Sequence, residues 1–533
     1  MRLFFRIFLF ACVFATEPAF AAMEDDDWNE VRSENFRILT NGDLAQARQL
    51  ARDLEQFRAS VIYVVGSKNI VSDIPFRILA LKSQADLRRF MNKRAGRGVA
   101  YSGGFNSSLR GNFAVIDMSV KEFDIDAKRV SAADSIIKHE YVHYILRAKS
   151  RLRYPYWYEE GFAEYLSTLQ YENGEVRVGF PVASWHFSLN VGGGRADLEK
   201  MLTATRENNL VGNRALYGSA WLLVHYLNDD QALAPKVQAY LSEYDKTGDS
   251  LGAFNRIFQL DLDRLTTDLR KRANAGKYGY RRLLLPVPIA EPAVTEAPVP
   301  KTEARLQVAG VLRVFRRDPD GLDDVAGIYQ DVLKAEPTNS RALAGLAEID
   351  MTKRQLAPAE ARLASIPDNV DEVSVLIARG DALVMKAFAA ARSPAELSAP
   401  LLEQARDSYI AALRKDNKCA EAYYSYGITY AGAENNAREG VLAIAEASRL
   451  VPSSAEMLLY HAMMLLQVGS YDEAAALSST AGQLLDSKIG RDFAQAVGRL
   501  ARERNADAAR TAVFTFAAER LMNINKEFDE EED

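Results

Sequence analysis

Two histidines lie four residues apart in the motif HEYVH at residues 139–143. Residues four apart share one face of a helix, so both imidazoles can reach one metal ion while Glu140 lies beside them. A catalytic zinc usually takes three protein ligands and keeps its fourth position for water. Glu160, seventeen residues after His143, is therefore the predicted third ligand. These residue types at this spacing predict metal-dependent hydrolysis.

The same residues have an ordinary alternative, because histidines and glutamates are common on helix surfaces and a bare HExxH occurs by chance. The chain has only five histidines, and His139 and His143 stand at the one spacing that a shared metal requires. A hydroxyl N-cap with an acidic residue three positions on, Ser131 to Asp134, precedes the motif. The context therefore favours a metal site, with Zn²⁺ as the expected ion.

Each carboxylate near the predicted metal has a different expected role. Zinc would lower the pKa of its bound water toward about 7, and Glu140 is the general base that takes the proton. A second helix, beginning near Pro155, places Glu160 and Glu164 on one face. Glu164 is predicted to accept the outer N–H of a metal-bound histidine, with a solvated surface charge as the alternative. Glu159 is the residue most easily mistaken for Glu160.

These residues resemble the gluzincin metallopeptidases, and within them the peptidase-MA-like domains related to zinc aminopeptidases. In that family a helix with Trp-x-x-Glu-Gly follows the HExxH helix, and Trp157, Glu160 and Gly161 match it. The resemblance implies that this glutamate is the third zinc ligand and that a tyrosine opening a later helix stabilises the oxyanion. The segment YGSAWLLVHYL at 217–227 fits that helix, so Tyr217 would have this role. A buried aromatic residue at a helix start is its alternative.

The sequence departs from the family at two points. The gap between His143 and Glu160 is slightly shorter than in the aminopeptidases. The predicted turn at 103–108 lacks the acidic residue with which aminopeptidases hold a free amine, so no exopeptidase preference carries over. The resemblance covers about residues 28–280, with specific motifs only from 139 to 227.

The three other histidines are not expected to bind the metal. His225 lies on an apolar helix and is predicted to be a core residue. His186 and His461 have no correctly spaced partner.

The first 22 residues predict a cleavable secretory signal, with a basic start, an apolar run from Ile7 to Phe14 and a small-residue pattern ending near Ala21. A lipoprotein-type cleavage box ending at Cys12 is the weaker alternative. Without Cys12, only Cys419 remains, so no intramolecular disulfide can form. A secreted chain of this length without a disulfide favours a bacterial periplasm.

Composition limits the classes of partner. The formal net charge of −6 becomes about −7 once the two arginines and one glutamate of the signal are removed, and this mildly acidic balance argues against nucleic-acid binding. No stretch after the signal approaches the length of a membrane span, so no integral span is expected. A chain of 533 residues with 48% hydrophobic content predicts at least two domains.

Five prolines between Pro286 and Pro300 predict an extended, semi-stiff linker at 285–302. The region before it, 23–284, has the mixed α/β pattern expected of the metallopeptidase-like domain. The linker would leave the two domains able to move relative to one another. Strands are expected at 28–31, 36–39, 76–80 and 112–118, and helices at 43–61 and 83–91.

The region at 303–525 is rich in alanine and predicted to be all-helical. Similar segments begin at Ala420 and Ala455, thirty-five residues apart, and small residues are expected where helices cross, as in tetratricopeptide repeats. Weaker copies begin near Pro337 and Asp368, an insertion lies around 393–400, capping helices are expected at 483–523, and an acidic disordered tail at 526–533. The predicted fold is thus an α+β gluzincin-like domain followed by an all-α tetratricopeptide-like solenoid.

The leading hypothesis is a periplasmic zinc metallopeptidase that hydrolyses a peptide or protein substrate. The peptide would add as a strand beside residues 112–118, and the repeats would recruit a substrate or partner protein or serve as a spacer. A non-catalytic scaffold that acts through its repeats is the alternative from another class. A metal-dependent hydrolase of a non-peptide bond is the third hypothesis.

Overall fold

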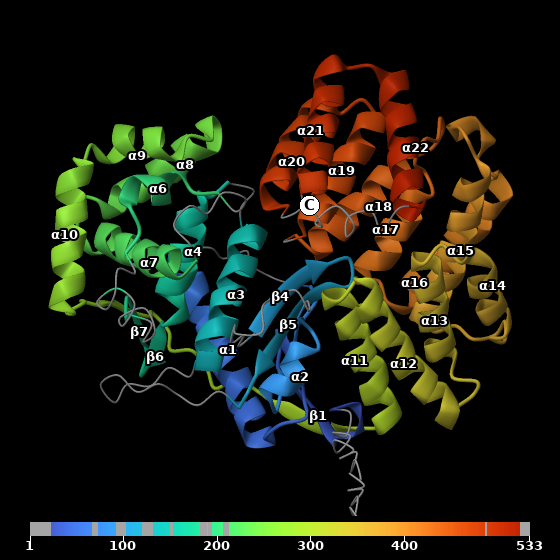
Figure 1. Ribbon diagram of the computed structural model, residues 1–533, viewed down its shortest axis with the longest axis horizontal. Coiled ribbons are helices and arrows are strands. Elements are labelled where there is room, and N and C mark those ends of the chain that lie inside the picture. Colours follow the sequence, from blue (N-terminus) through green and yellow to red (C-terminus); the bar gives the residue numbers. More distant parts are fainter. Residues whose placement is uncertain are drawn as a thin grey trace, which may run out of the picture.

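The computed structural model describes residues 23–66, 73–91, 103–119, 132–149, 153–181, 189, 195–205, 213–452, 454–485 and 488–522. A mixed α/β region comes first, and a long series of helices follows it (Figure 1). The coarse order of the predicted fold is therefore confirmed. The predicted signal 1–22, Ser131 of the capping signal and the acidic tail 526–533 lie outside the described residues.

A six-stranded sheet with the order β4-β5-β3-β2-β1-β9 lies at the centre of the first region. Its strands are β1 (Trp28–Arg32), β2 (Phe36–Thr40), β3 (Phe76–Leu81), β4 (Gly103–Ser108), β5 (Gly111–Asp117) and β9 (Thr295–Val299). The three strands β2, β3 and β5 run parallel, whereas β4, β1 and β9 pair antiparallel with their neighbours. The four strands expected from alternating apolar residues are all present, within two residues of their predicted ends.

Residues 103–108 form the edge strand β4 and not the predicted turn. This strand pairs with β5 from Gly103 opposite Ile116 to Ser108 opposite Gly111, and the turn itself is Leu109 and Arg110. Glycine, asparagine and serine are typical of turns, but an edge strand tolerates them. Because β5 has strands on both sides, a peptide cannot add beside it, and that prediction was wrong.

The helices of the first region pack around this sheet and beside it. They are α1 (Leu44–Val64), α2 (Gln84–Arg88), α3 (Ala132–Lys149), α4 (Tyr156–Ser167), α6 (Leu198–Thr203), α7 (Asn213–Asp229), α8 (Val237–Thr247), α9 (Ser250–Phe258) and α10 (Leu262–Ala275). A smaller sheet contains β6 (Gln170–Glu172), β7 (Glu175–Val178) and β8 (Arg281–Leu284). Asp43 caps α1 by accepting a hydrogen bond from the backbone N–H of Gln46, as expected of an aspartate at an N-cap.

The second region consists of antiparallel helix pairs. Its helices are α11 (Lys301–Phe315), α12 (Pro319–Ala335), α13 (Ser340–Thr352), α14 (Leu356–Ala364), α15 (Val373–Ala390), α16 (Ala399–Lys415), α17 (Ala420–Ile428), α18 (Ala437–Leu450), α19 (Ala455–Gln467), α20 (Tyr471–Leu484), α21 (Lys488–Glu503) and α22 (Ala506–Met522). Successive helices contact each other, and the predicted insertion lies at the connection between α15 and α16. None of the helices in the described part of the chain is long and apolar enough to cross a membrane.

Glycines permit close helix crossings in these pairs, as the sequence predicted. A Cβ atom on Gly380 would lie 2.5 Å from the ring of Tyr409, and one on Gly427 would lie 2.6 Å from Ile444. Gly345 meets the ring of Tyr329 in the same way. A side chain at any of these positions would force the two helices apart.

The two faces of the central sheet are covered by helices from different regions of the chain (Figure 1). Alternate strand residues point to opposite faces. One face packs with α1 and α3 through Phe36, Ile38, Phe76, Ile78, Ala114 and Ile116. The other shares a core with α11, α12 and α13 through Leu39, Leu79, Leu81 and Val115. The first helices of the repeats therefore complete the core of the α/β region.

The proline-rich segment is extended, as predicted, but it is not a free tether. Residues 295–299 form β9, which pairs antiparallel with β1 and places Pro298 opposite Asn29. A proline is acceptable there because β9 lies at the end of the sheet. The pairing of β9 with β1 and the shared core join the two regions. The prediction that the two domains can move relative to one another was therefore wrong.

We expect Leu312→Ala to destabilise the α/β region although the residue lies in α11. Leu312 is fully buried in the shared core, and removing its side chain should lower the free energy of unfolding by about 2–5 kcal/mol. All four tryptophans precede α11 in the chain. Tryptophan fluorescence measured during urea denaturation therefore reports on the unfolding of the α/β region.

The matched control is Leu442→Ala on α18, where the leucine is 70% exposed and the change should stay within about 0.5 kcal/mol. If Leu312→Ala does not change the urea concentration at the midpoint of the fluorescence transition, the two regions unfold independently.

Candidate metal centre

Helix α3, which contains the HEYVH motif, packs against the sheet through its aromatic side chains. The ring of Tyr141 lies 5.0 Å from that of Phe36 and 5.2 Å from that of Phe76, and Tyr144 lies 5.6 Å from Phe76. Ile137 and Ile145 are fully buried in the same core. This packing leaves the face with the two histidines turned toward α4.

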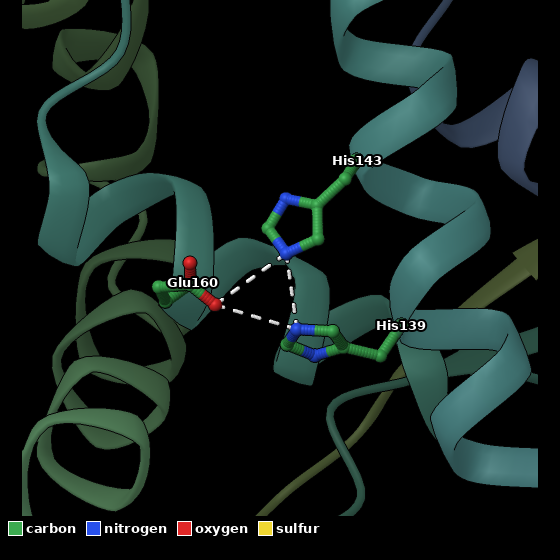
Figure 2. A group of neighbouring side chains, drawn as sticks. All are labelled: His139, His143 and Glu160. Atoms are coloured by element: carbon green, nitrogen blue, oxygen red, sulfur yellow. Dashed lines mark hydrogen bonds and ion pairs between the residues drawn. The ribbon is translucent and has the colours of Figure 1, made fainter. Parts of the chain in front are cut away.

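The two imidazoles and the carboxylate of Glu160 converge on one point between α3 and α4 (Figure 2). The Nε2 atoms of His139 and His143 are 3.0 Å apart. Oε2 of Glu160 lies 3.3 Å from Nε2 of His139 and 3.4 Å from Nε2 of His143. The structure thus brings together the three residues that the sequence named as metal ligands.

This donor set fits a metal ion of the zinc type. Ligand atoms at zinc–nitrogen and zinc–oxygen distances of about 2.0–2.2 Å in a tetrahedron lie roughly 3.3–3.6 Å from one another. The observed separations of 3.0, 3.3 and 3.4 Å are close to that range. Imidazole and carboxylate also suit other divalent metals, so the geometry supports a metal site without naming its ion.

Two further carboxylates lie behind the histidines. Oε1 of Glu164 is 3.2 Å from Nδ1 of His139, where the sequence placed it. Oε1 of Glu159 is 3.3 Å from Nδ1 of His143, a position that the sequence did not predict. A carboxylate beside the outer ring nitrogen orients a metal-binding histidine and fixes its tautomer. Each histidine therefore has its own glutamate within ion-pair distance of its outer nitrogen.

The sequence contained one signal for the part played by Glu159. It directly precedes the predicted ligand in a helix that faces the motif. The four-residue spacing places Glu160 and Glu164 on one face of α4, but it does not reveal that Glu159 also lies beside the site. Only the angle between α3 and α4 assigns Glu159 to His143.

The charges of this cluster depend on one another. Burial alone would lower the pKa of His139, but the carboxylates of Glu164 and Glu160 raise it well above the ordinary value. Burial likewise opposes the rise in the pKa of His143, which Glu160 and Glu159 cause. Burial would raise the pKa of Glu160, yet the two imidazoles hold it well below its usual range. The buried carboxylate thus requires positive charge beside it, from protons or from a metal.

Glu140 and Tyr217 lie next to this group. Glu140 directly follows His139 in α3, and its charge contributes to the raised pKa of both His139 and Tyr217. The rings of Tyr217 and His139 are 6.0 Å apart. Burial, and then Glu160, raise the pKa of Tyr217 well above its ordinary value, so the hydroxyl keeps its proton and can donate it in a hydrogen bond.

The position of Tyr217 in its helix differs slightly from the prediction. Helix α7 begins at Asn213, so the tyrosine lies one turn inside the helix and does not open it. Helix α4 contributes Glu160 to the site, and α7 contributes Tyr217.

Gly161 sets how closely these two helices approach. A Cβ atom at this position would lie 2.6 Å from the backbone carbon and oxygen of Ala220 in α7. Gly161 directly follows Glu160, and Ala220 is three residues after Tyr217. Trp157 fixes the start of α4 by donating a hydrogen bond from Nε1 to Oη of Tyr240, at 3.0 Å. The Trp-x-x-Glu-Gly pattern thus has a packing explanation.

His225 is a buried core residue, as the sequence predicted. His225 is buried among aromatic rings, and its Nε2 lies 2.8 Å from the backbone oxygen of Gly279. Burial lowers the pKa of His225. His461 is buried in α19, and neither residue belongs to a metal-binding group among the described residues. His186 lies outside the described residues.

Comparison with known proteins identifies no family for this chain. No family model matches it, and no curated protein matches it. A thermophilic TPR protein of Thermus thermophilus is similar in structure, with 18% identity, 37% of this chain and 98% of that chain covered, and a TM-score of 0.31. For YrrB, a TPR protein with an unusual peptide-binding site, these values are 13%, 36%, 91% and 0.25. For pilF of Pseudomonas aeruginosa they are 16%, 43%, 95% and 0.29.

All three similar structures are much smaller than this chain, and their TM-scores are too low to support an argument. The repeat character of the second region rests on its own helix pairs.

We expect Gly161→Ala to weaken metal binding as well as stability. The added methyl group must push α4 away from α7, which should cost about 1–3 kcal/mol and displace Glu160 from the two imidazoles. Urea denaturation and titration with Zn²⁺ or Co²⁺ measure the two effects.

Gly327→Ala is the control, because a Cβ atom there meets nothing within 4 Å and alanine favours the helix. It should leave metal affinity unchanged and stability equal or slightly higher. Equal metal affinity in both variants would contradict the packing role of Gly161.

Proposed function

We propose that this protein is a zinc-dependent metallopeptidase that acts in a bacterial periplasm. The single observation that carries the proposal is the convergence of His139, His143 and Glu160, with Glu140 next to His139 in α3. A buried metal site alone could be structural. A further carboxylate on the same helix turn, together with a protonated tyrosine, supplies the groups that hydrolysis requires. The signal-like segment 1–22 supports the location.

Each residue has a defined part in this proposal. The side chains of His139, His143 and Glu160 would hold the metal, which when bound supplies a water activated at neutral pH and polarises the scissile carbonyl. Glu140 accepts the proton of the water and delivers it to the leaving amine. The Oη–H group of Tyr217 donates a hydrogen bond where negative charge develops on the carbonyl oxygen.

The sheet edge supports a peptide as the substrate class. Helix α3 contacts both β4 and β5, and β4 is the outermost strand on that side. Among the described strands, none pairs with the outer edge of β4. Strand addition at an exposed edge binds the backbone of an extended peptide whatever its sequence. We therefore propose that the peptide adds as a strand to the edge of β4 and not beside β5.

Metal content and hydrolysis test the proposal together. We expect the wild-type protein to contain about one zinc per chain and to cleave unfolded protein substrates. His143→Ala should lose both metal and activity. Glu140→Gln should keep the metal and lose about 10²–10⁴-fold in kcat, because it removes only the proton acceptor.

The control for Glu140→Gln is Glu199→Gln, the same change at an exposed position of α6, which should alter neither quantity. A folded wild-type protein that takes up no zinc would refute the proposal. Full activity in Glu140→Gln would exclude the assigned mechanism.

Tyr217→Phe should lower kcat by about 10²–10³-fold and leave KM nearly unchanged, because the hydroxyl would act only on the charge of the transition state. Tyr226→Phe makes the same change nine residues along α7, at a partly buried position, and should behave as wild type. Steady-state kinetics on a fluorogenic peptide would measure both. Equal kcat values for the two variants would remove Tyr217 from the mechanism.

An adaptor that acts through its helical repeats is the second candidate. A cavity of about 220 Å³ between the repeats and the β4–β5 turn favours it. The two candidates separate in cells, since an adaptor should function normally with Glu140→Gln and a peptidase should not.

A further inference from the structure

The tip of the β4–β5 hairpin lies against the helical repeats. Figure 1 shows the two strands extending from the sheet toward α17. Leu109, the first residue of the turn, packs against the apolar cluster formed mainly by α15 to α19. The hairpin thus connects the edge of the sheet with a distant part of the chain.

Arg110, the second residue of the turn, binds two of these helices. Its Nη2 atom is 2.9 Å from Oε2 of Glu348 in α13 and 2.9 Å from Oε1 of Glu421 in α17. Three quarters of the arginine side chain is buried, and the two glutamates are 8% and 21% exposed. Ion pairs screened from water to this degree fix geometry far better than exposed pairs do.

The contacts of Arg110 belong to a regular feature of the repeats. Four carboxylates line the cavity at the turn, one from the first helix of each successive pair, and they are Glu348, Asp381, Glu421 and Glu456. Tyr409 donates a hydrogen bond to Asp381 at 2.7 Å, and Tyr460 donates one to Glu456 at 2.9 Å. The other two carboxylates, Glu348 and Glu421, are the ones that Arg110 binds.

The two glutamates differ in how much they depend on the hairpin. Glu348 also pairs with Arg313 of α11. Among the described residues, Arg110 is the one cation within ion-pair distance of Glu421. The Arg110–Glu421 contact is therefore the specific connection between the hairpin and the middle of the repeats.

Strand β4 needs such a connection. It has a partner on one side only, and its glycines and small polar residues give it weak strand propensity. Strand β3 pairs with β5 only from Phe113 to Asp117, so the end of the hairpin beside the turn has no third strand to support it in the described part of the chain. Yet β4 is the strand next to α3, which carries the metal site.

We propose that Arg110 is a positioning residue, through which the repeats hold the β4 edge in the place where it binds the extended substrate. The inference rests on the proposed peptidase function. It assigns to the repeats a direct effect on substrate binding, exerted through the ion pairs of one mostly buried arginine and without any separate partner.

Arg110→Ala in the full chain tests this role. We expect hydrogen exchange of the β4 amides to become at least tenfold faster, and KM for an unfolded protein substrate to rise several-fold with kcat and zinc content little changed. Glu421→Gln leaves the Arg110–Glu348 pair in place, so it should change both quantities in the same direction and by less. The double variant should be no worse than Arg110→Ala, because the contact of Glu421 is already lost when Arg110 is removed.

Arg449→Ala is the matched control. It removes another ion pair between the two regions, with Asp73, but this arginine is half exposed and lies off the hairpin. Its β4 exchange and its KM should equal those of wild type. A general loosening of the two regions would instead change all the variants alike.

The outcomes separate the positioning role from the function beneath it. Wild-type β4 exchange and KM in Arg110→Ala would overturn the inference while leaving the peptidase proposal intact. Faster exchange with unchanged KM would show that the ion pair holds the hairpin but that β4 does not bind substrate, which also overturns it. Absence of hydrolysis in the wild-type protein would instead refute the proposed function, and the exchange data would still decide whether Arg110 fixes the hairpin.

Discussion

The structure depends on one constraint, which is that the central sheet has apolar side chains on both faces and both must be removed from water. Helices α1 and α3 cover one face, and α11 to α13 cover the other. The helices that begin the repeats are therefore part of the core of the α/β region, and β9 extends the same sheet. The helix with the candidate metal site packs on one face of the sheet, and the first helices of the repeats pack on the other. Two regions that differ in composition and periodicity consequently form one folded unit.

The candidate metal centre is a product of helix packing. Tyr141 presses one face of α3 onto the sheet, which turns the two histidines toward α4, and Gly161 lets α4 approach the backbone of α7. These contacts bring two imidazoles and three carboxylates into a small, mostly buried volume. Such a cluster is costly unless its charges balance, and here each carboxylate near a ring nitrogen raises a histidine pKa while the histidines lower that of Glu160. A divalent cation can replace the protons of this cluster, and that exchange couples metal affinity to pH.

The helical repeats contribute an acidic inner surface as well as a scaffold. One carboxylate from each of four successive helix pairs lines the cavity where the β4–β5 turn enters. Tyrosine hydroxyls satisfy two of them, and the buried guanidinium of Arg110 satisfies the other two. The concave surface that stacked helical repeats generally offer to a partner is here partly filled by the chain itself. The edge of the sheet, the metal-bearing helix and the repeats are thus linked through contacts rather than through a flexible connection.

Most elements and the candidate ligands could be predicted from the sequence alone. Short apolar and β-branched runs predicted four strands, and the four-residue spacing of His139 and His143 predicted a shared metal site, because both signals are local. Glu160 was predicted from the ligand type that such a site needs and from the Trp-x-x-Glu-Gly pattern, Glu164 from its place one helix turn later, and the repeats from similar segments thirty-five residues apart. Tertiary structure alone decided that 103–108 is the edge strand, that the proline-rich segment is β9, that Glu159 accompanies His143, and that Arg110 reaches the repeats. The places of β9 and Arg110 depend on contacts between segments far apart in the chain, about which spacing along the sequence holds no information. The edge strand pairs with β5 across a two-residue turn, but its composition is typical of turns, and the place of Glu159 depends on the angle between α3 and α4.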